Sequence, residues 1–292
     1  MRPQIIATLG LLGMFTVLGC AKDPSEPTPT ATPGELTDKP ATDPSPTGIL
    51  SEDAFAALHQ LTEAEAPPLH GQTIELGGGH AYLALPEGAT GPVPAVVVIH
   101  EWWGLNDHIR HWADRLAEDG YAALAVDLYA GGVATDPQGA MSLMKTVDPA
   151  QAQAMLSAAH EFLATDPRIQ APHQAVIGWC FGGGWSLRDA IATPGLDAAV
   201  IYYGNPVTDP AELAKIEAPL LGVFANDDQA IPPAVVDELA TALEGAGKSI
   251  ELHRYDAQHA FANPSNARYQ QAEAADAWAH TRRFLAKHLR PQ

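Results

Sequence analysis

The hydrophobic positions from residue 71 onward alternate between short apolar runs and longer stretches with helical spacing. Runs such as AVVVIH at residues 95–100 are apolar almost throughout, as expected of strands buried on both faces of a sheet. Stretches such as residues 106–119 place apolar side chains three or four positions apart, which is typical of helices that cover a sheet. This alternation predicts an α/β fold in which a mostly parallel central sheet carries helices on both faces.

The predicted strands and helices follow one another through the whole of this region. A hairpin is expected around three glycines at residues 77–79, which stand between the apolar positions of residues 74–76 and 82–85. The later strands are expected at residues 95–100, 123–129, 175–178, 198–203, 219–225 and 249–255. Helices are expected at residues 106–119, 149–163, 232–246 and 267–289, with another beginning at Gly182 and a short one after Pro210.

A separate apolar pattern precedes the sheet region. Residues 49–65 place four apolar side chains at helical spacing, and Ser51 is a suitable N-cap. The four are Leu50, Phe55, Leu58 and Leu61. We predict a short helix packed on the main domain, within a lead-in of residues 49–70 that precedes a domain of residues 71–292.

The first residues have the pattern of an export signal. Residues 5–19 are apolar and uncharged, and Arg2 precedes them. As a helix this run would span only about 22 Å, less than the ~30 Å hydrocarbon core of a bilayer. The run ends in Gly19-Cys20 and resembles a bacterial lipoprotein signal, in which the cysteine is lipidated. We predict a signal peptide over residues 1–19 and a lipid on Cys20; an ordinary cleaved signal and an uncleaved anchor are the alternatives.

Residues 20–48 have the composition of a tether. Residues 21–48 contain seven prolines, six threonines and no aromatic residue, so they cannot bury enough apolar surface to offset the entropy of ordering. A tether behind a lipidated cysteine implies secretion across the inner membrane and a lipid anchor in the bacterial envelope. Ala21 stands where an aspartate would resemble an inner-membrane retention signal, which favours the outer membrane.

Composition and charge narrow the class of partner. The 292 residues are 46% hydrophobic and 17% charged, which excludes global disorder. The 16 basic and 35 acidic residues give a formal charge of -19, and this argues against a nucleic acid or an anionic lipid surface as the partner. The two cysteines, Cys20 and Cys180, do not predict a disulfide framework.

The second cysteine lies in a motif with a chemical role. The segment GWCFG at residues 178–182 follows a predicted strand and begins a helix, so it matches the G-x-S-x-G nucleophile elbow with Cys180 in the serine position. The glycines let the strand and the helix approach closely, and a helix N-terminus favours a thiolate. A buried cysteine beside a glycine-rich bend is the structural alternative. A phosphate loop is disfavoured because no Gly-Lys-Ser/Thr sequence follows.

Candidate partners for Cys180 follow later predicted strands. Asp228 comes after the strand at residues 219–225, and His259 comes after the last strand. The chain order nucleophile, acid, histidine is typical of α/β-hydrolases, and open parallel sheets hold their sites at the carboxyl ends of the strands. Asp227 is the adjacent alternative to Asp228 as the acid.

Five segments with recognisable motifs occur in order along the chain. They are HEWWG at residues 100–104, DLYA at 127–130, GWCFGG at 178–183, Asp228 followed by Ile231-Pro232, and HAF at 259–261. Together they resemble the dienelactone hydrolase family of α/β-hydrolases over about residues 71–290. The resemblance implies that Cys180 is the nucleophile, His259 the general base and Asp228 the carboxylate that orients the base. It also implies that Glu101 contacts the thiol and assists its activation.

Two positions depart from that family. Its type enzyme binds the dienelactone carboxylate with arginines at the positions of Gly131 and Asn263. Because bidentate arginines give much of carboxylate recognition, these positions argue against dienelactone itself as the substrate. The aromatic residues Trp103, Tyr203 and Phe261 are candidates to line an apolar substrate pocket, with a place in the core as the alternative.

The sequence therefore predicts hydrolysis of a carboxylic ester or lactone, a small molecule, through an acyl-cysteine. Backbone N–H groups of Phe181 and Trp102 are expected to hold the oxyanion. One alternative is an acyltransferase or thioesterase that uses the same Cys-His-Asp triad. The other is a non-catalytic binding module anchored in the envelope.

No cofactor or metal is expected from the sequence. The pair His100-Glu101 would begin the zinc motif H-E-x-x-H, but Gly104 interrupts it. His108 and His111 lie three residues apart on a polar helix face, which is a weak metal signal. No segment indicates a nucleotide or a flavin.

Overall fold

The computed structural model describes residues 47–63, 65–89 and 91–290. The predicted signal peptide over residues 1–19, Cys20 and the tether as far as residue 46 lie outside these ranges. Lipidation and anchoring therefore stay predictions. Within the described ranges, no helix combines the length and the apolar character that crossing a bilayer requires.

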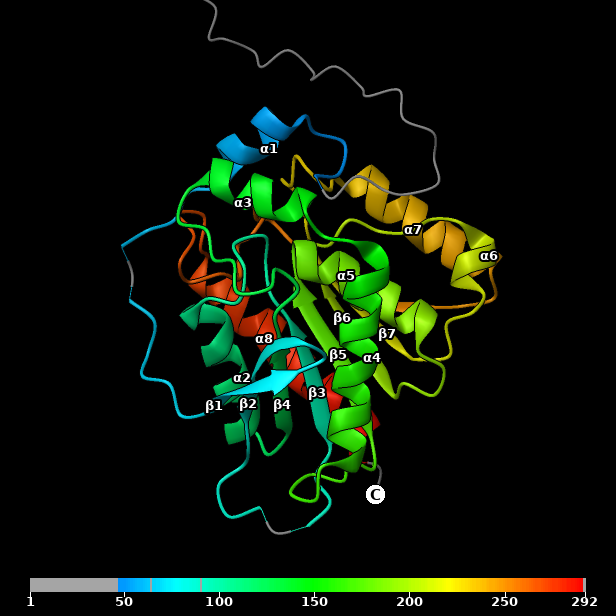
Figure 1. The fold of residues 1–292 in the computed structure, drawn as a ribbon. Coiled ribbons are helices and arrows are strands. Elements are labelled where there is room, and N and C mark those ends of the chain that lie inside the picture. Colours follow the sequence, from blue (N-terminus) through cyan, green and yellow to red (C-terminus); the bar gives the residue numbers. More distant parts are fainter. Residues whose placement is uncertain (1–46, 64, 90, 291–292) are drawn as a thin grey trace, which may run out of the picture. The chain divides into compact units, whose positions relative to one another are not determined.

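A central sheet of eight strands organises the described chain (Figure 1). Its order is β1-β2-β4-β3-β5-β6-β7-β8. The bounds are β1 Gln72–Leu76, β2 Gly79–Ala84, β3 Ala95–Ile99, β4 Ala122–Val126, β5 Gln174–Trp179, β6 Ala198–Tyr202, β7 Leu220–Ala225 and β8 Ile250–Tyr255. β2 pairs antiparallel with β1 and with β4, and every later pair is parallel. The predicted α/β-hydrolase fold class is confirmed.

The central strands are buried along their whole length, which explains their unbroken apolar sequences. β3 is buried at all five positions and lies between β4 and β5, with Val97 opposite Leu124 on one side and Val176 on the other. Because both faces are covered, neither alternate row of side chains reaches water. Parallel strands also end at the same edge, so the loops after β3, β5, β7 and β8 meet there.

Helices cover both faces of the sheet (Figure 1). α2 (Asp107–Glu118) and α8 (Gln271–Leu289) share one face, where the rings of Trp112 and Trp278 lie 4.7 Å apart. α4 (Pro149–Thr165) and α5 (Phe181–Ala192) share the other, where His160 Nε2 and Asp189 Oδ2 are 2.8 Å apart. The remaining helices are α1 Glu52–Leu58, α3 Pro137–Lys145, α6 Pro210–Leu213 and α7 Pro233–Gly245.

Two helices differ from the expectation. α3 was not predicted, although the pair Asp136-Pro137 signals its start and the Asp136 carboxylate accepts from Gly139 N. α8 begins at residue 271 rather than 267. The preceding residues are held in turns instead, because Asn266 Oδ1 accepts from Arg268 N and Phe261 O accepts from Gln270 N.

The segment that precedes the sheet contains one short helix, α1. Ser51 caps α1 by accepting from Ala54 N at 3.3 Å, and Phe55 is buried. The helix ends at residue 58, so Leu61 forms an isolated bridge with Asn266 instead of extending the helical face. We call residues 47–62 the strap.

Backbone hydrogen bonds fix the strap at both ends. Near its start, Ile49 N donates to Ala230 O at 3.2 Å. Near its end, Thr62 N donates to Ser265 O at 2.8 Å, and the Arg268 guanidinium donates to Leu58 O at 2.6 Å. The partners lie in the loops that follow β7 and β8, so the strap crosses the edge of the sheet where parallel strands end.

Candidate active site

Cys180 occupies a strained turn between β5 and α5. Its backbone has φ 55° and ψ -116°, a conformation that non-glycine residues rarely adopt. The neighbouring glycines are required by contact. A Cβ on Gly178 would lie 2.2 Å from Gly182 O, and one on Gly182 would lie 2.3 Å from Ile99 O. The local sequence therefore forms the nucleophile elbow that the motif predicts.

The thiol of Cys180 is buried, with only 4% of the residue exposed. Burial raises the pKa of the thiol, while His259 and the backbone N–H of Phe181 act to lower it. Desolvation is the largest of these influences, so a thiolate forms only with a cationic partner beside it. A histidine can supply such a cation near neutral pH.

His259 and Asp228 form a buried pair in the loops after β8 and β7. His259 Nδ1 lies 2.6 Å from Asp228 Oδ2. The other carboxylate oxygen accepts from the backbone N–H groups of Ala230 and Ile231, at 2.8 and 2.9 Å. Since a carboxylate only accepts, Nδ1 carries the proton and Nε2 carries the lone pair. The adjacent Asp227 is exposed, so Asp228 is the residue that the structure places on the histidine.

The opposite charges of His259 and Asp228 shift the pKa of each residue. Burial acts to lower the pKa of His259, but Asp228 and Cys180 oppose it, and the pKa stands well above 6.5. Burial acts to raise the pKa of Asp228, yet His259 and the backbone donors bring it below 3.8. The carboxylate of Asp228 therefore stabilises the protonated form of His259 when the ring takes up a proton at Nε2.

Glu101 lies in the loop after β3 and is buried. Its carboxylate accepts from the Asn263 side-chain amide and, at 3.4 Å, from the Tyr203 hydroxyl. Burial raises its pKa from 4.5 to about 7, against the opposing effect of His259. The charge of Glu101 in turn acts to raise the pKa of Cys180.

Asn263 takes a role that the sequence did not suggest. The sequence comparison singled it out only as the place of a missing arginine. Its amide N–H₂ donates to Glu101, and its oxygen accepts from Ser265 N at 2.8 Å. A neutral donor at this position satisfies a buried carboxylate without adding a charge. Gly131, the other departure, has φ 93°, so its backbone favours glycine over any side chain.

The remaining predicted site residues surround the triad. Phe181 is the first residue of α5, where backbone N–H groups lack intrahelical acceptors, and Trp102 follows Glu101 in the opposite loop. Tyr203 packs its ring 5.1 Å from that of His259. Trp103 and Phe261 are enclosed as well. The Phe261 ring lies 5.8 Å from that of Tyr203, and the Trp103 ring lies 6.5 Å from that of His59. We call the rings of Trp103, Tyr203 and Phe261 the aromatic wall, and their role in substrate binding stays a prediction.

His59 is a neighbour of Cys180 that the sequence did not reveal. It lies in the strap, just after α1, and its Nε2 is 3.9 Å from Cys180 Sγ. Its Nδ1 donates to Phe55 O at 2.8 Å, which leaves Nε2 as the acceptor facing the thiol. Burial and then the charge of His259 lower the pKa of His59 from 6.5 to about 3. No motif marks this residue, one of twelve histidines.

The strap closes the site. The rings of Phe55 and His59 lie 5.8 and 5.1 Å from the ring of His259, and both residues are buried. His259 is itself only 3% exposed. The described conformation is therefore a closed one, in which a strap side chain lies 3.9 Å from Cys180 Sγ.

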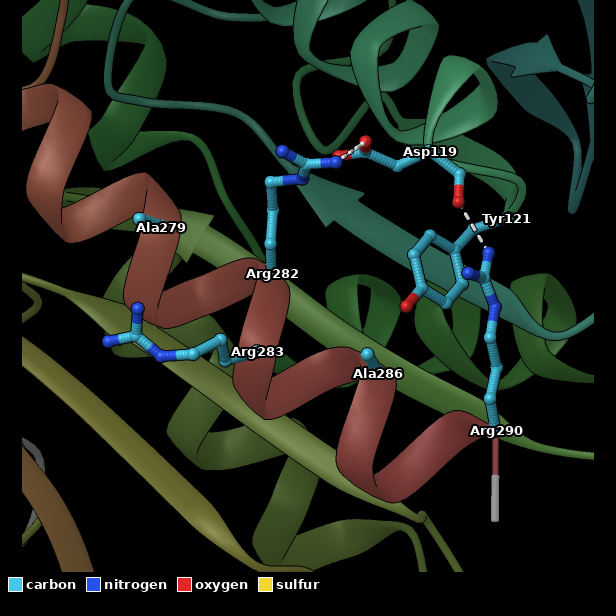
Figure 2. Close-up of a pocket in the computed structure, with 7 residues that line it drawn as sticks. All are labelled: Asp119, Tyr121, Ala279, Arg282, Arg283, Ala286 and Arg290. Atoms are coloured by element: carbon cyan, nitrogen blue, oxygen red, sulfur yellow. Dashed lines mark hydrogen bonds and ion pairs between the residues drawn. The ribbon is translucent and has the colours of Figure 1, made fainter. Parts of the chain in front are cut away.

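A hollow on another part of the surface does not share this chemistry. Figure 2 shows Arg282 and Arg290 reaching Asp119, with Arg290 stacked 4.2 Å above the Tyr121 ring. These groups lie beside the start of β4, at the opposite edge of the sheet from Cys180. The arginines already have partners, and the hollow contains no nucleophile.

His100 also has a structural place. Its Nδ1 donates to Glu101 O at 2.6 Å, and its Nε2 accepts from Leu128 N at 3.1 Å. Both ring nitrogens are thus engaged by backbone groups, which join the loops after β3 and β4.

The chain is similar in sequence to a known protein family and to several of its members. Residues 80–289 match the Dienelactone hydrolase family. The "Putative carboxymethylenebutenolidase" of Methylorubrum extorquens is 34% identical over 214 residues, which cover 68% of this chain and 73% of that protein. The protein of the same name from Escherichia coli K12 is 33% identical over 214 residues, covering 68% and 78%.

Solved structures resemble the fold as well. The "Putative Dienelactone Hydrolase" of Klebsiella pneumoniae has a TM-score of 0.68 at 29% identity, covering 76% of this chain and all of that one. A dienelactone hydrolase-like promiscuous phosphotriesterase from metagenomic libraries has a TM-score of 0.68 at 25% identity, covering 75% and 98%.

Proposed function

Because the chain belongs to the dienelactone hydrolase family, and is thereby an ester or lactone hydrolase, we propose that it works through an acyl-cysteine on Cys180. The observation that carries this proposal is the elbow cysteine beside a histidine whose Nδ1 proton is fixed by Asp228. The lone pair at His259 Nε2 is buried and has no hydrogen-bond partner among the described residues. It is therefore available to take the thiol proton.

The first half of the reaction forms a thioester. Cys180 Sγ attacks the carbonyl carbon, and the thiol proton passes to His259 Nε2. The carbonyl π electrons move to oxygen, where the backbone N–H groups of Phe181 and Trp102 hold the oxyanion. When the oxyanion collapses, the carbon–oxygen bond to the alcohol breaks, and the imidazolium protonates the departing alkoxide.

The second half consumes one water. His259, neutral again, removes a proton from water as the oxygen attacks the thioester carbon. The carbon–sulfur bond then breaks, the acid product leaves, and the proton returns to sulfur. Asp228 stabilises the imidazolium in both halves through the 2.6 Å contact.

The substrate class follows from what surrounds the thiol. The aromatic wall of Trp103, Tyr203 and Phe261 is buried. Asn263 is occupied by Glu101, and Gly131 offers no side chain, so neither position supplies a cation for a substrate carboxylate. We therefore propose an uncharged ester or lactone with an apolar acyl part.

The test is a panel of nitrophenyl esters and lactones with the wild type and Cys180→Ala. Hydrolysis by the wild type should fall to background in the variant. Intact-mass analysis during turnover of a slow ester should show one added acyl group on the wild type only. Equal activity in both proteins would overturn the nucleophile assignment. Added alcohols or amines would reveal acyl transfer as a new product.

We also propose that Cys20 is lipidated and anchors the domain in the envelope. The support is the apolar run that ends at Gly19 and the proline-rich segment that follows the cysteine. Mass spectrometry of the mature N-terminus in the native host tests this. A mature chain beginning at a diacylglyceryl-modified Cys20 is expected, and a free N-terminus elsewhere contradicts it.

A further inference from the structure

Three side chains that can bind a metal ion lie close together between the strap and the turn that carries Cys180. His59, Cys180 and His259 each offer one atom that can bind a metal, and these atoms lie within 4.8 Å of one another. All three residues are buried, with exposed fractions of 2%, 4% and 3%. Two imidazoles and a thiolate suit Zn²⁺ in a tetrahedral site with one open position.

The second contacts of the histidines fit a metal site. His59 donates its Nδ1 proton to Phe55 O at 2.8 Å, and His259 donates its own to Asp228 at 2.6 Å. Histidines that ligate metals almost always donate the other ring proton to a carbonyl or a carboxylate in this way. Both Nε2 lone pairs therefore face the thiol, and that of His259 is buried without a partner among the described residues.

The ligand atoms must move closer together to bind an ion, and the distance can be bounded. With Zn–S near 2.3 Å and Zn–N near 2.0 Å, tetrahedral sulfur and nitrogen ligands lie about 3.5 Å apart. Cys180 Sγ and His59 Nε2 are 3.9 Å apart, so this pair must close by roughly 0.4 Å. Since every pair is within 4.8 Å, none must close by more than roughly 1.5 Å.

The charges around the site also suit a divalent ion. Binding would convert the Cys180 thiol to a thiolate, and the buried carboxylate of Asp228 lies 2.6 Å from His259 Nδ1, so negative charge would lie close to the ion. His59 lies outside residues 80–289, which match the family, so the third ligand comes from the strap and not from the family's shared domain.

We propose that Cys180, His59 and His259 bind Zn²⁺ and so lock the strap over the nucleophile. On binding, the thiol gives up its proton to solvent, and the sulfur and both Nε2 lone pairs form bonds to the ion. The loaded protein holds no free thiolate and no free base, so it cannot form a thioester. Zinc is thus an inhibitor that acts through the strap.

Cobalt is a direct probe of this site, because Co²⁺ in a tetrahedral thiolate site absorbs in the visible and near-ultraviolet, where neither the metal-free protein nor Zn²⁺ does. The full chain carries a second cluster, Glu251, His253 and His280, at the surface, so titrations use the His253→Gln background. We expect one equivalent of Co²⁺ to give a thiolate band that Zn²⁺ abolishes.

Three further variants in that background locate the ligands. His59→Gln should weaken Zn²⁺ binding by more than about tenfold in competition with a chromogenic chelator. Cys180→Ser should lose the thiolate band while keeping the volume of the side chain. His80→Gln, at an exposed histidine, is the matched control and should bind as the parent does.

Two results would overturn the proposal. One is the absence of a thiolate band in the parent at one equivalent of Co²⁺. The other is unchanged Zn²⁺ affinity in both His59→Gln and Cys180→Ser. Because these are spectra and affinities, they do not depend on hydrolysis, so a failed metal site is distinguishable from a failed hydrolase assignment.

Discussion

Replacing Asp228 with asparagine separates the orientation of His259 from its burial. The carboxylate accepts at both oxygens: Oδ1 from the N–H groups of Ala230 and Ile231, and Oδ2 from His259. An asparagine fits the same space, but it must place its N–H₂ group on one side. If the N–H₂ group faced the N–H groups of Ala230 and Ile231, buried donors would face one another without an acceptor. The N–H₂ group therefore turns to His259.

The consequence falls on the tautomer. Facing an amide donor, His259 Nδ1 must accept, so the proton moves to Nε2 and no lone pair faces Cys180. The corresponding change in a serine protease triad lowers kcat about 10⁴-fold. We expect a loss of that order here, equivalent to about 5 kcal/mol of transition-state stabilisation. The fold should persist because all three hydrogen bonds remain, with the one to His259 reversed in direction.

The assay is kcat/KM for an activated ester, with thermal unfolding to confirm the fold. Asp227→Asn is the matched control, because its side chain is exposed and adjacent in sequence, and it should retain wild-type activity. Activity of Asp228→Asn within about tenfold of the wild type, in a folded protein, would refute the proposed role of the tautomer.

Three other changes test the remaining physical claims. Burial raises the pKa of Glu101 to about 7, so ionisation of Glu101 lowers the free energy of unfolding as the pH rises from 4.5 to 7. Glu101→Gln should therefore raise the free energy of unfolding by about 3 kcal/mol at pH 8 and leave it unchanged below pH 4. Chemical denaturation at the two pH values measures this difference. Gly178→Ala places a Cβ 2.2 Å from Gly182 O and should lower Tm by several degrees or prevent folding, whereas Gly245→Ala, where nothing lies within 4 Å, should not lower Tm. Phe55→Ala removes the buried ring that holds α1, so it should speed hydrogen exchange of the strap amides and raise kcat/KM for bulky esters. Asp53→Asn, at an exposed residue, should change neither quantity. Unchanged exchange in Phe55→Ala would show that other contacts hold the strap.

Much of the fold is readable in the sequence because the central strands are buried on both faces. β3 and β6 have no solvent-facing row, so their sequences are apolar throughout and their bounds agree with prediction within one residue. α8 was harder, because residues 267–270 have helical composition. Their backbone groups are instead engaged by Asn266 and Phe261, contacts that no periodicity records.

The site divides in the same way. The elbow could be predicted because close packing leaves no choice but glycine at residues 178 and 182. His59 could not be, because its place depends on where α1 ends and on the bonds that fold the strap back over the loops. Asn263 was noticed only as a substitution, since a bond to Glu101 across 162 residues leaves no local pattern.

Because the strap covers Cys180, the rate at which its thiol is modified depends on how often the strap opens. Because only 4% of Cys180 is exposed, we expect its sulfur to react with a small alkylating agent or a peroxide mainly in the fraction of molecules whose strap is open. The modification rate therefore measures that fraction, and every 1.4 kcal/mol of strap stabilisation slows it about tenfold. In an oxidising compartment, the contacts of residues 47–62 set how long Cys180 remains a thiol before it becomes a sulfenic acid. The lifetime of the Cys180 thiol is then a property of a segment that precedes the family's shared domain.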